Sequence, residues 1–326
     1  MTQITSLRTV DTRMHPLFFS SFDVKDCWDE MGPVVTTNLR LTIQQCTKPD
    51  TQERRKALYM HENPHGNLFT LTLGLCEAER VGSIVRILQF LCIIDDVLEV
   101  LPHGDALVEH DILCDGLRGF SNACTPNTRP EWIKFLQDVK AEVIAVDPIR
   151  GPALFLTFEE SLRIRDSSDV EFEAIKQYLP YRLINFDYEL VANLILWAMD
   201  VDLSPEEADS ELLHDFKYSI GVIVGLINDY YSWEREKRQQ QDSDRIRNGV
   251  AVLMKQHNLS DQDAKAAVKK MIIEEELKIH TMLENPQLEI STALKRFLDG
   301  LRMFAGGYSF WCATCPRYQK PEGDSD

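Results

Sequence analysis

The chain has 326 residues, of which 44% are hydrophobic, and this length and composition are enough for a sizeable core. Its 35 basic and 52 acidic residues give a formal net charge of −17, which argues against nucleic acid as a partner because phosphate-backbone binders carry a basic stripe. No apolar run reaches the roughly 18 residues that a membrane span needs, and the N-terminus has no apolar signal core. We therefore expect a cytoplasmic protein with no membrane partner, whose eight scattered cysteines are reduced.

Helical periodicity, with apolar residues recurring three or four positions apart, dominates the chain. In chain order, the segments with this pattern are residues 79–100, 131–146, 188–203, 211–237, 263–283 and 292–311. Ser204, followed by Pro205 and two glutamates, predicts the start of a further helix with Ser204 as its N-cap. The polar stretch 235–249 is expected to be a mobile loop after a helix end.

No stretch alternates apolar and polar residues for long enough to form a sheet, and no linker or internal repeat divides the chain. Proline and glycine clusters, as at residues 63–66 and 101–104, only interrupt the helical pattern. We therefore predict one all-α domain over residues 1–318 and a disordered tail over residues 319–326.

An acidic cluster ends the apolar run of residues 84–94. On a helix, Asp95 and Glu99 are four residues apart and share a face, and Asp96 lies three residues from Glu99. Like charges held this close repel each other, whereas a hard cation such as Mg²⁺ removes the repulsion and prefers oxygen ligands. The alternative is a helix end whose acids point into solvent.

A second polar stripe follows the apolar residues 220–227. Asn228, Ser232 and Glu236 are spaced four residues apart and therefore share one face of one helix. A carboxamide, a hydroxyl and a carboxylate form an all-oxygen set that suits Mg²⁺. Because polar side chains on a buried helix face need partners, the two clusters together favour a metal site over a solvated face.

These clusters, D-D-x-x-E at residues 95–99 and N-D-x-x-S-x-x-x-E at residues 228–236, resemble the two metal-binding motifs of class I terpene synthases. Arg182 precedes Asn228 by about the spacing of the family's diphosphate-sensing arginine, and Arg317-Tyr318 resembles the Arg-Tyr pair that closes over the diphosphate. The resemblance runs from about residue 60 to residue 318. It is closest to the fungal type, which includes standalone cyclases and the cyclase halves of bifunctional diterpene and sesterterpene synthases.

The resemblance implies a helical bundle around a central active-site cavity, in which Mg²⁺-dependent ionisation of a linear isoprenoid diphosphate is followed by cyclisation of the carbocation. It implies three Mg²⁺ ions, held by Asp95, Asp96, Glu99, Asn228, Ser232 and Glu236. It also implies that the diphosphate accepts hydrogen bonds from Arg182, Arg235, Arg317 and Tyr318. The expected catalytic residues are Asp95, Arg182, Asn228, Ser232 and Glu236.

The carbocation is expected to lie against aromatic rings, because a desolvated cation over a ring face gains about 0.5–2 kcal/mol. The aromatic residues near the motifs, and hence the candidates for the substrate pocket, are Phe69, Phe90, Phe186, Trp197 and Trp311. For each of them the alternative is ordinary packing between helices. His61, near a loop break, is expected to be structural or to face solvent.

The fungal bifunctional resemblance favours geranylgeranyl diphosphate as the substrate, with geranylfarnesyl and farnesyl diphosphates as alternatives. Two other functions stay open at this point. One is a trans-prenyltransferase, although the second motif lacks the Asp-rich pattern of those enzymes, and the other is a non-catalytic binder of isoprenoid diphosphates. A homo-oligomer, and a covalent or separate prenyltransferase partner, also stay open.

Overall fold

The computed structural model describes residues 3–99, 101–120, 125, 127–165, 171–239, 247–284 and 289–318, and over these ranges its secondary structure is mainly helical. The helices are α1 (Trp28–Cys46), α2 (Gln52–Tyr59), α3 (Leu68–Thr72), α4 (Ala78–Leu98), α5 (His103–Arg118), α6 (Pro130–Val146), α7 (Gly151–Ile164), α8 (Ile175–Asn185), α9 (Tyr188–Ala198), α10 (Pro205–Ala208), α11 (Glu211–Gln239), α12 (Gly249–His257), α13 (Asp261–Leu283) and α14 (Thr292–Thr314). A short 3₁₀ helix, Thr12–Met14, lies between two strands, β1 (Arg8–Thr9) and β2 (Lys25–Asp26), which pair antiparallel. The predicted all-α class is confirmed.

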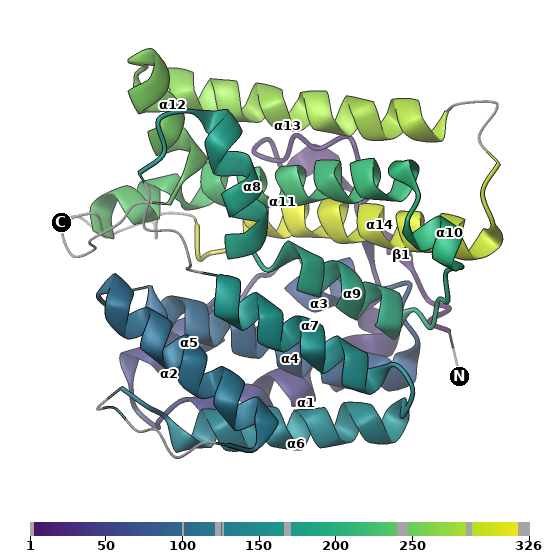
Figure 1. Ribbon diagram of the computed structural model, residues 1–326. Coiled ribbons are helices and arrows are strands. Elements are labelled where there is room, and N and C mark those ends of the chain that lie inside the picture. The colour runs from purple at the N-terminus through teal and green to yellow at the C-terminus, as the bar shows by residue number, and fades with distance from the viewer. Residues whose placement is uncertain are drawn as a thin grey trace.

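The helices form two groups that meet at a central cavity (Figure 1). On one side lie α8, α11, α12, α13 and α14, and on the other lie α1, α2, α4, α5, α6 and α7. Between them, α9 contacts both α4 and α14, and α3 packs against α14. The cavity is therefore walled by elements that are far apart in the sequence, chiefly α4, α11 and α14.

Two adjacent glycines let α14 approach its neighbours closely. A Cβ atom at Gly307 would overlap the carbonyl oxygen of Leu71 in α3, and one at Gly306 would lie 2.8 Å from the carbonyl oxygen of Asp23. Backbone atoms cannot swing away as flexible side chains do, so larger residues here would push the elements apart. The close approach keeps Leu68, at the start of α3, beside α14 in the wall of the cavity.

The six periodic segments of the sequence correspond to α4, α6, α9, α11, α13 and α14, with differences at their ends. α9 ends at Ala198 rather than near residue 203, and Asp200 just beyond it has a left-handed φ of 51° that does not continue a helix. Ser204 caps α10 as predicted. Its side chain accepts from the N–H of Glu207, and the Glu207 carboxylate accepts from the Ser204 N–H, which completes a capping box.

Part of the predicted loop at residues 235–249 is helical. α11 continues through Gln239, and Lys237 and Arg238 in its last turn suit the negative end of the helix dipole. The rest of that stretch up to residue 246, and the predicted tail at residues 319–326, lie outside the described residues.

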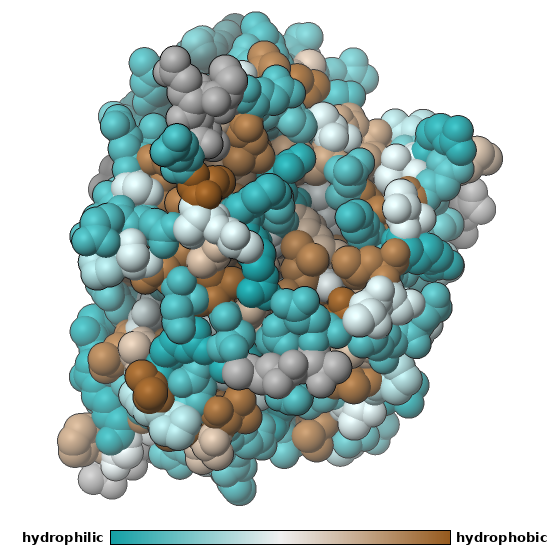
Figure 2. Space-filling view, turned by 90° about the vertical axis from the view of Figure 1, so that its right-hand side faces the viewer, coloured by the Kyte–Doolittle hydropathy of each residue, from teal (hydrophilic) through white to brown (hydrophobic). Residues whose placement is uncertain are grey.

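None of the described helices is both long enough and apolar enough to cross a membrane. Figure 2 shows the face on the side of α10, where hydrophilic residues are interspersed with hydrophobic groups. The buried core holds large aromatic side chains from several helices, among them Phe90, Phe135 and Trp311.

Candidate active site

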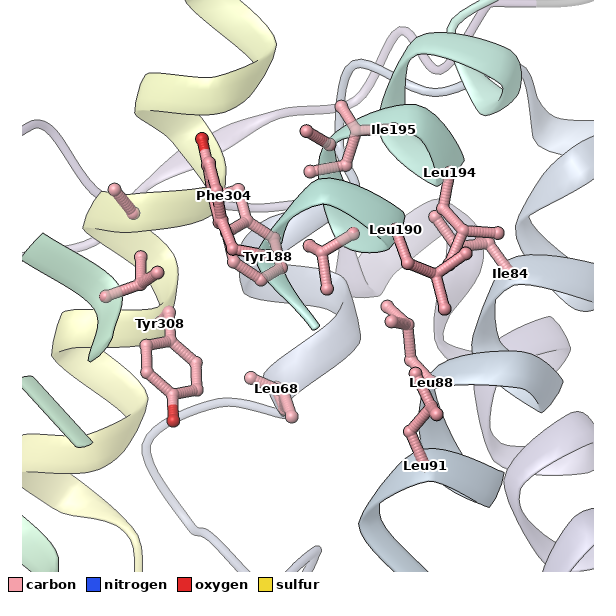
Figure 3. Close-up of a cluster of buried hydrophobic side chains, with 14 of the residues drawn as sticks. Leu68, Ile84, Leu88, Leu91, Tyr188, Leu190, Leu194, Ile195, Phe304 and Tyr308 are labelled. Atoms are coloured by element: carbon pink, nitrogen blue, oxygen red, sulfur yellow. The ribbon is translucent and has the colours of Figure 1, made fainter. Parts of the chain in front are cut away.

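The cavity between α4, α11 and α14 has an apolar end and a polar end. Its apolar wall includes Leu68 of α3, Leu88 and Leu91 of α4, and Phe304 of α14. Figure 3 shows these leucines and Tyr308 around the space between α4 and α14. Its polar end is lined by Asp95, Glu99, Arg165, Arg182, Asn185, Asp187, Asn228, Arg235, Glu236, Arg247, Arg317 and Tyr318. Residues from both predicted motifs therefore face one cavity.

The two aspartates in the last turn of α4 are held by arginines from distant parts of the chain. Asp95 accepts a hydrogen bond from Nη2 of Arg165 at 2.6 Å, and Asp96 pairs with both terminal nitrogens of Arg317 at 2.6 and 2.9 Å. Nη1 of Arg235 lies 3.6 Å from Oδ1 of Asp96. Burial opposes ionisation of Asp96, but the charge and hydrogen bonds of Arg317 outweigh it and lower the pKa of Asp96. Asp96 thus contacts two of the arginines that the resemblance assigns to the diphosphate.

Glu99 follows α4 and lines the same cavity as Glu236 of α11. Although Glu99 remains exposed to solvent, enclosure by the surrounding chain raises its pKa to about 7, and the negative charges of Asp95, Glu236 and Asp96 act in the same direction. The charge of Arg235 opposes this rise without cancelling it. Desolvation is therefore the main cause of the raised pKa of Glu99, and the neighbouring carboxylates add to it.

Asn228 of α11 connects three parts of the chain. Its Oδ1 accepts a hydrogen bond from Nη2 of Arg182 at 2.8 Å. Its Nδ2 donates to the hydroxyl oxygens of Tyr308, at 2.9 Å, and Tyr318, at 3.0 Å. Arg182 and Tyr318, the two predicted diphosphate-binding residues from α8 and from the segment after α14, therefore meet at a residue of the second motif.

Ser232 and Glu236 share a partner that the sequence analysis missed. Nδ2 of Asn248 donates to Oε2 of Glu236 at 2.9 Å and lies 3.5 Å from Oγ of Ser232, which is fully buried. Asn248 is the N-cap of α12, where its Oδ1 accepts from the N–H of Val250. An Asn-Gly pair before an apolar segment signals a helix start, but nothing in the sequence places it against α11.

Arg182 is fixed by an acid next to the second motif. Its Nε lies 2.9 Å from Oδ1 of Asp229, and the other oxygen of Asp229 accepts from the hydroxyl of Tyr178 at 2.8 Å and from the N–H of Gly249 at 2.9 Å. Burial raises the pKa of Asp229 to about 6, and the charge of Arg182 opposes this rise. Gly225 leaves room for this packing, since a Cβ atom there would lie 3.0 Å from Cγ of Arg182.

Arg165, which follows α7, joins the first motif to the junction of α8 and α9. While its Nη2 donates to Asp95, its Nη1 lies 2.9 Å from Oδ2 of Asp187. Asp187 is buried in a left-handed conformation, with φ of 53°, and accepts a further hydrogen bond from Oγ of Ser161 at 2.6 Å. Sequence spacing gave no signal for Arg165, because its role depends on how α7 packs against α9.

Three of the five aromatic residues expected in the pocket, Phe69, Phe186 and Trp311, line the cavity. Phe304 and Tyr308 line it as well, and their rings stack with centroids 6.0 Å apart. Because residues 304, 308 and 311 fall on one face of α14, that helix supplies a continuous aromatic wall.

The structure corrects the prediction for Phe90 and Trp197, which do not line the cavity. Phe90 turns away from the cavity and packs against Phe135 and Trp132 of α6, with ring centroids 5.1 and 5.8 Å away. Trp197 lies under the guanidinium of Arg80, whose carbon is 4.8 Å from the ring centroid. Both residues sit on helices that are buried on several sides, so closeness to a motif in the sequence does not say which side faces the cavity.

The donor chemistry of the polar end fits a hard cation. Among the residues that the structure describes, no three histidine, cysteine, aspartate or glutamate side chains are grouped as a metal site. However, the six predicted ligands all offer oxygen atoms, which are the donors that Mg²⁺ prefers. In this arrangement Arg165 and Arg317 occupy oxygens of Asp95 and Asp96, so a cation bound to those oxygens would require the arginines to exchange partners. Asn248 uses only one oxygen of Glu236.

Comparison with known sequences agrees with this geometry. Residues 86–278, more than half of the chain, match the model of the family described as terpene synthase family 2, C-terminal metal binding. The chain is 30% identical over 281 residues to a bifunctional terpene synthase of Fusarium proliferatum, a match that covers 83% of this chain and 37% of the relative. It is 27% identical over 274 residues to a sesterterpene synthase of Colletotrichum orbiculare, covering 78% of this chain and 37% of that protein. The chain thus spans little more than a third of these relatives.

Solved structures show the same fold. Aristolochene synthase from Penicillium roqueforti superposes with a TM-score of 0.70 at 20% identity, over 87% of this chain and 95% of that one. A protein from ancestral sequence reconstruction, SVS_A2, superposes with a TM-score of 0.74 at 14% identity, over 94% and 90% of the two chains. Together with the family match and the fungal relatives, these findings mean that the chain belongs to terpene synthase family 2, a family of enzymes, and is of the fungal class I type.

Proposed function

We propose that the chain is a Mg²⁺-dependent terpene cyclase, which ionises a linear isoprenoid diphosphate and cyclises the resulting carbocation. The observation that carries this proposal is the division of one cavity into two ends. Arginines, tyrosine and oxygen-rich motifs gather at the polar end, and leucine and aromatic side chains line the remainder. A molecule with an anionic head and a long apolar tail matches that division.

The polar end would bind the diphosphate head. Arg182, Arg235, Arg317 and Tyr318 would donate hydrogen bonds to its oxygens, where negative charge grows as the carbon–oxygen bond breaks. Three Mg²⁺ ions would be held by Asp95, Asp96, Glu99, Asn228, Ser232 and Glu236. Bound there, Mg²⁺ supplies Lewis-acid stabilisation of the charge on the leaving group.

The apolar end would fold the tail and shield the cation. Phe186, Phe304, Tyr308 and Trp311 present rings to the cavity, where each ring face can stabilise a desolvated cation by about 0.5–2 kcal/mol. Exclusion of water by Leu68 and its neighbours would keep the cation from being quenched before ring closure. The chain's contribution is therefore to orient the tail, stabilise charge and exclude water.

The preferred substrate in this proposal is geranylgeranyl diphosphate, with geranylfarnesyl and farnesyl diphosphates as alternatives. The support comes from relatives named as bifunctional and sesterterpene synthases, of which this chain matches about a third. A prenyltransferase, covalently joined or separate, would supply this substrate.

The proposal is tested by incubating the protein with each of the three diphosphates, with and without Mg²⁺, and analysing extracts by gas chromatography–mass spectrometry. A cyclic product that requires Mg²⁺, and that disappears in Asp95→Ala and Asn228→Ala, is the expected result. Phe90→Leu serves as the matched control, because Phe90 is buried near the first motif without lining the cavity. Folded protein that turns over none of the three substrates would refute the cyclase proposal.

The same assay separates the rival functions. A longer diphosphate formed in the presence of isopentenyl diphosphate would identify a trans-prenyltransferase. Saturable binding of a substrate diphosphate without any turnover would identify a non-catalytic binder.

A further inference from the structure

The side chain of Asn248 uses all of its hydrogen-bonding groups in the interior of the protein. It is fully buried, and its Oδ1 accepts from the N–H of Val250 at 2.8 Å, which caps α12. Its Nδ2 donates to Oε2 of Glu236 at 2.9 Å and to the carbonyl oxygen of Asp229 at 3.0 Å, with Oγ of Ser232 at 3.5 Å. Capping α12 requires only the side-chain oxygen of Asn248, so the hydrogen bonds that its NH₂ group donates to α11 have a separate role.

We propose that Asn248 is a positioning residue for the divalent cation, which holds Ser232 and Glu236 in the arrangement that binds it. This inference rests on the proposed function. Ser232 and Glu236 lie one turn apart on α11, and the side-chain amide of Asn248 donates to Glu236 and lies 3.5 Å from Oγ of Ser232. Glu236 lines the cavity and accepts this hydrogen bond through Oε2, so its other oxygen, Oε1, is the one that would bind the cation. Glutamate has several rotatable bonds, so a buried donor on one oxygen restricts where the other oxygen points.

The backbone beside Asn248 ties the same element to the diphosphate-binding arginine. The N–H of Gly249 donates to Oδ2 of Asp229 at 2.9 Å, and Oδ1 of that carboxylate lies 2.9 Å from Nε of Arg182. A side chain at Gly249 would crowd this contact, because a Cβ atom there would lie 3.0 Å from Asp229 Oδ2. The start of α12 therefore holds the second motif and, through Asp229, the arginine that meets Asn228.

The test uses Asn248→Ser, because serine caps a helix about as well as asparagine but has no amide to reach Glu236. The matched control is Ser260→Ala, which removes the N-cap of α13 but no hydrogen bond to Ser232 or Glu236. Mg²⁺ binding is measured by isothermal titration calorimetry in the presence of inorganic diphosphate, and melting temperatures are recorded alongside. Partners that orient metal ligands typically contribute 10–100-fold to affinity, so we expect the Kd for Mg²⁺ to rise about 10- to 100-fold in Asn248→Ser only.

Steady-state turnover provides a second measurement, because a positioning role predicts that the Mg²⁺ requirement changes while kcat does not. In Asn248→Ser the Mg²⁺ concentration for half-maximal turnover rises, while kcat at saturating Mg²⁺ stays within a few-fold of the unaltered protein. If Asn248→Ser does not fold, Asn248→Thr replaces it, because threonine also caps a helix and lacks the amide.

The outcomes of these measurements test the proposed function and the role of Asn248 separately. Unaltered protein that does not bind Mg²⁺ with diphosphate refutes the proposed function and the role of Asn248 with it. Normal binding by the unaltered protein and by Asn248→Ser alike refutes only the role of Asn248. An equal loss of affinity in Ser260→Ala also overturns it, because it would reduce the effect to general destabilisation.

Discussion

Replacing Asp229 with asparagine removes one charge from a buried pair and changes almost nothing in volume. Asp229 is fully buried, and the side chain of Arg182 is 8% exposed. One carboxylate oxygen faces Nε of Arg182, and the other accepts from the hydroxyl of Tyr178 and the N–H of Gly249. In Asp229→Asn, one of these two positions becomes an NH₂ group that points at existing donors.

The expected loss of stability in Asp229→Asn has two contributions. A buried donor left without an acceptor costs about 1–3 kcal/mol, and removing one partner of a buried ion pair costs about 3–5 kcal/mol in all. We therefore expect the free energy of unfolding of Asp229→Asn to fall by about 3–5 kcal/mol, which a domain of ordinary stability survives. Repulsion between the new NH₂ group and Arg182 would also loosen the contact of Arg182 with Asn228.

Stability is measured by urea unfolding at about pH 7.5, followed by circular dichroism. The dependence of the free energy of unfolding on urea concentration is checked to be the same in each variant. Asp26→Asn is the matched control. Asp26 is buried to a similar degree, but its partner Arg8 is 65% exposed at 3.2 Å and can turn to solvent, so the loss should stay below about 1 kcal/mol. Equal losses in the two variants would refute the reasoning, because they would show that burial of the arginine does not set the cost.

Three further predictions concern packing, pH and product formation. Gly307→Ala should lower the free energy of unfolding by about 1–3 kcal/mol in urea titrations, because the added methyl group overlaps the carbonyl oxygen of Leu71; unchanged stability would mean that α14 can shift. Burial lowers the pKa of His61 from 6.5 to about 4. As pH falls, the unfolded chain therefore binds a proton before the folded protein does, and the free energy of unfolding decreases progressively between pH 6.5 and pH 4. Over this pH range the free energy of unfolding of the unaltered protein should fall by about 3 kcal/mol more than that of His61→Gln, as followed by melting curves. The same pH dependence in both proteins would contradict the prediction. Phe186→Leu should change the product mixture seen by gas chromatography, whereas Phe90→Leu should lower stability with the mixture unchanged; the reverse would contradict the lining of the cavity.

The positions of the long helices, though not their exact ends, and the spacing of the two motifs could be predicted because their signals are local. Asp95 and Glu99, or Asn228 and Ser232, share a face simply through helical spacing, and a cap such as Ser204 acts on its own helix. The structure places Asp95, Glu99, Asn228 and Glu236 in the lining of one cavity, while Asp96 and Ser232 do not line it. The roles of all six as metal ligands stay predictions.

The residues that support the motifs could not be predicted, because their contacts join elements that are distant in sequence. Arg165 reaches Asp95 across 70 positions, and Asn248 reaches α11 from the start of a different helix. The same limit explains the error at Phe90. α4 is buried on nearly every side, so hydrophobicity alone does not distinguish the side that faces α6 from the side that faces the cavity.

The pairing of Asp95 and Asp96 with arginines has a thermodynamic consequence for ligand binding. Each arginine that neutralises a carboxylate is, for the same reason, withheld from an incoming anion, and each carboxylate is withheld from a cation. A metal that displaces Arg317 from Asp96 would release it toward the diphosphate, and a diphosphate that attracts Arg317 would release Asp96 toward the metal. The affinities for the two ligands are then linked, and by reciprocity each must strengthen the other by the same factor. Neither ligand alone would fill the site as well as both together, so under the proposed function this internal pairing would make the polar end respond to the metal and the diphosphate in combination.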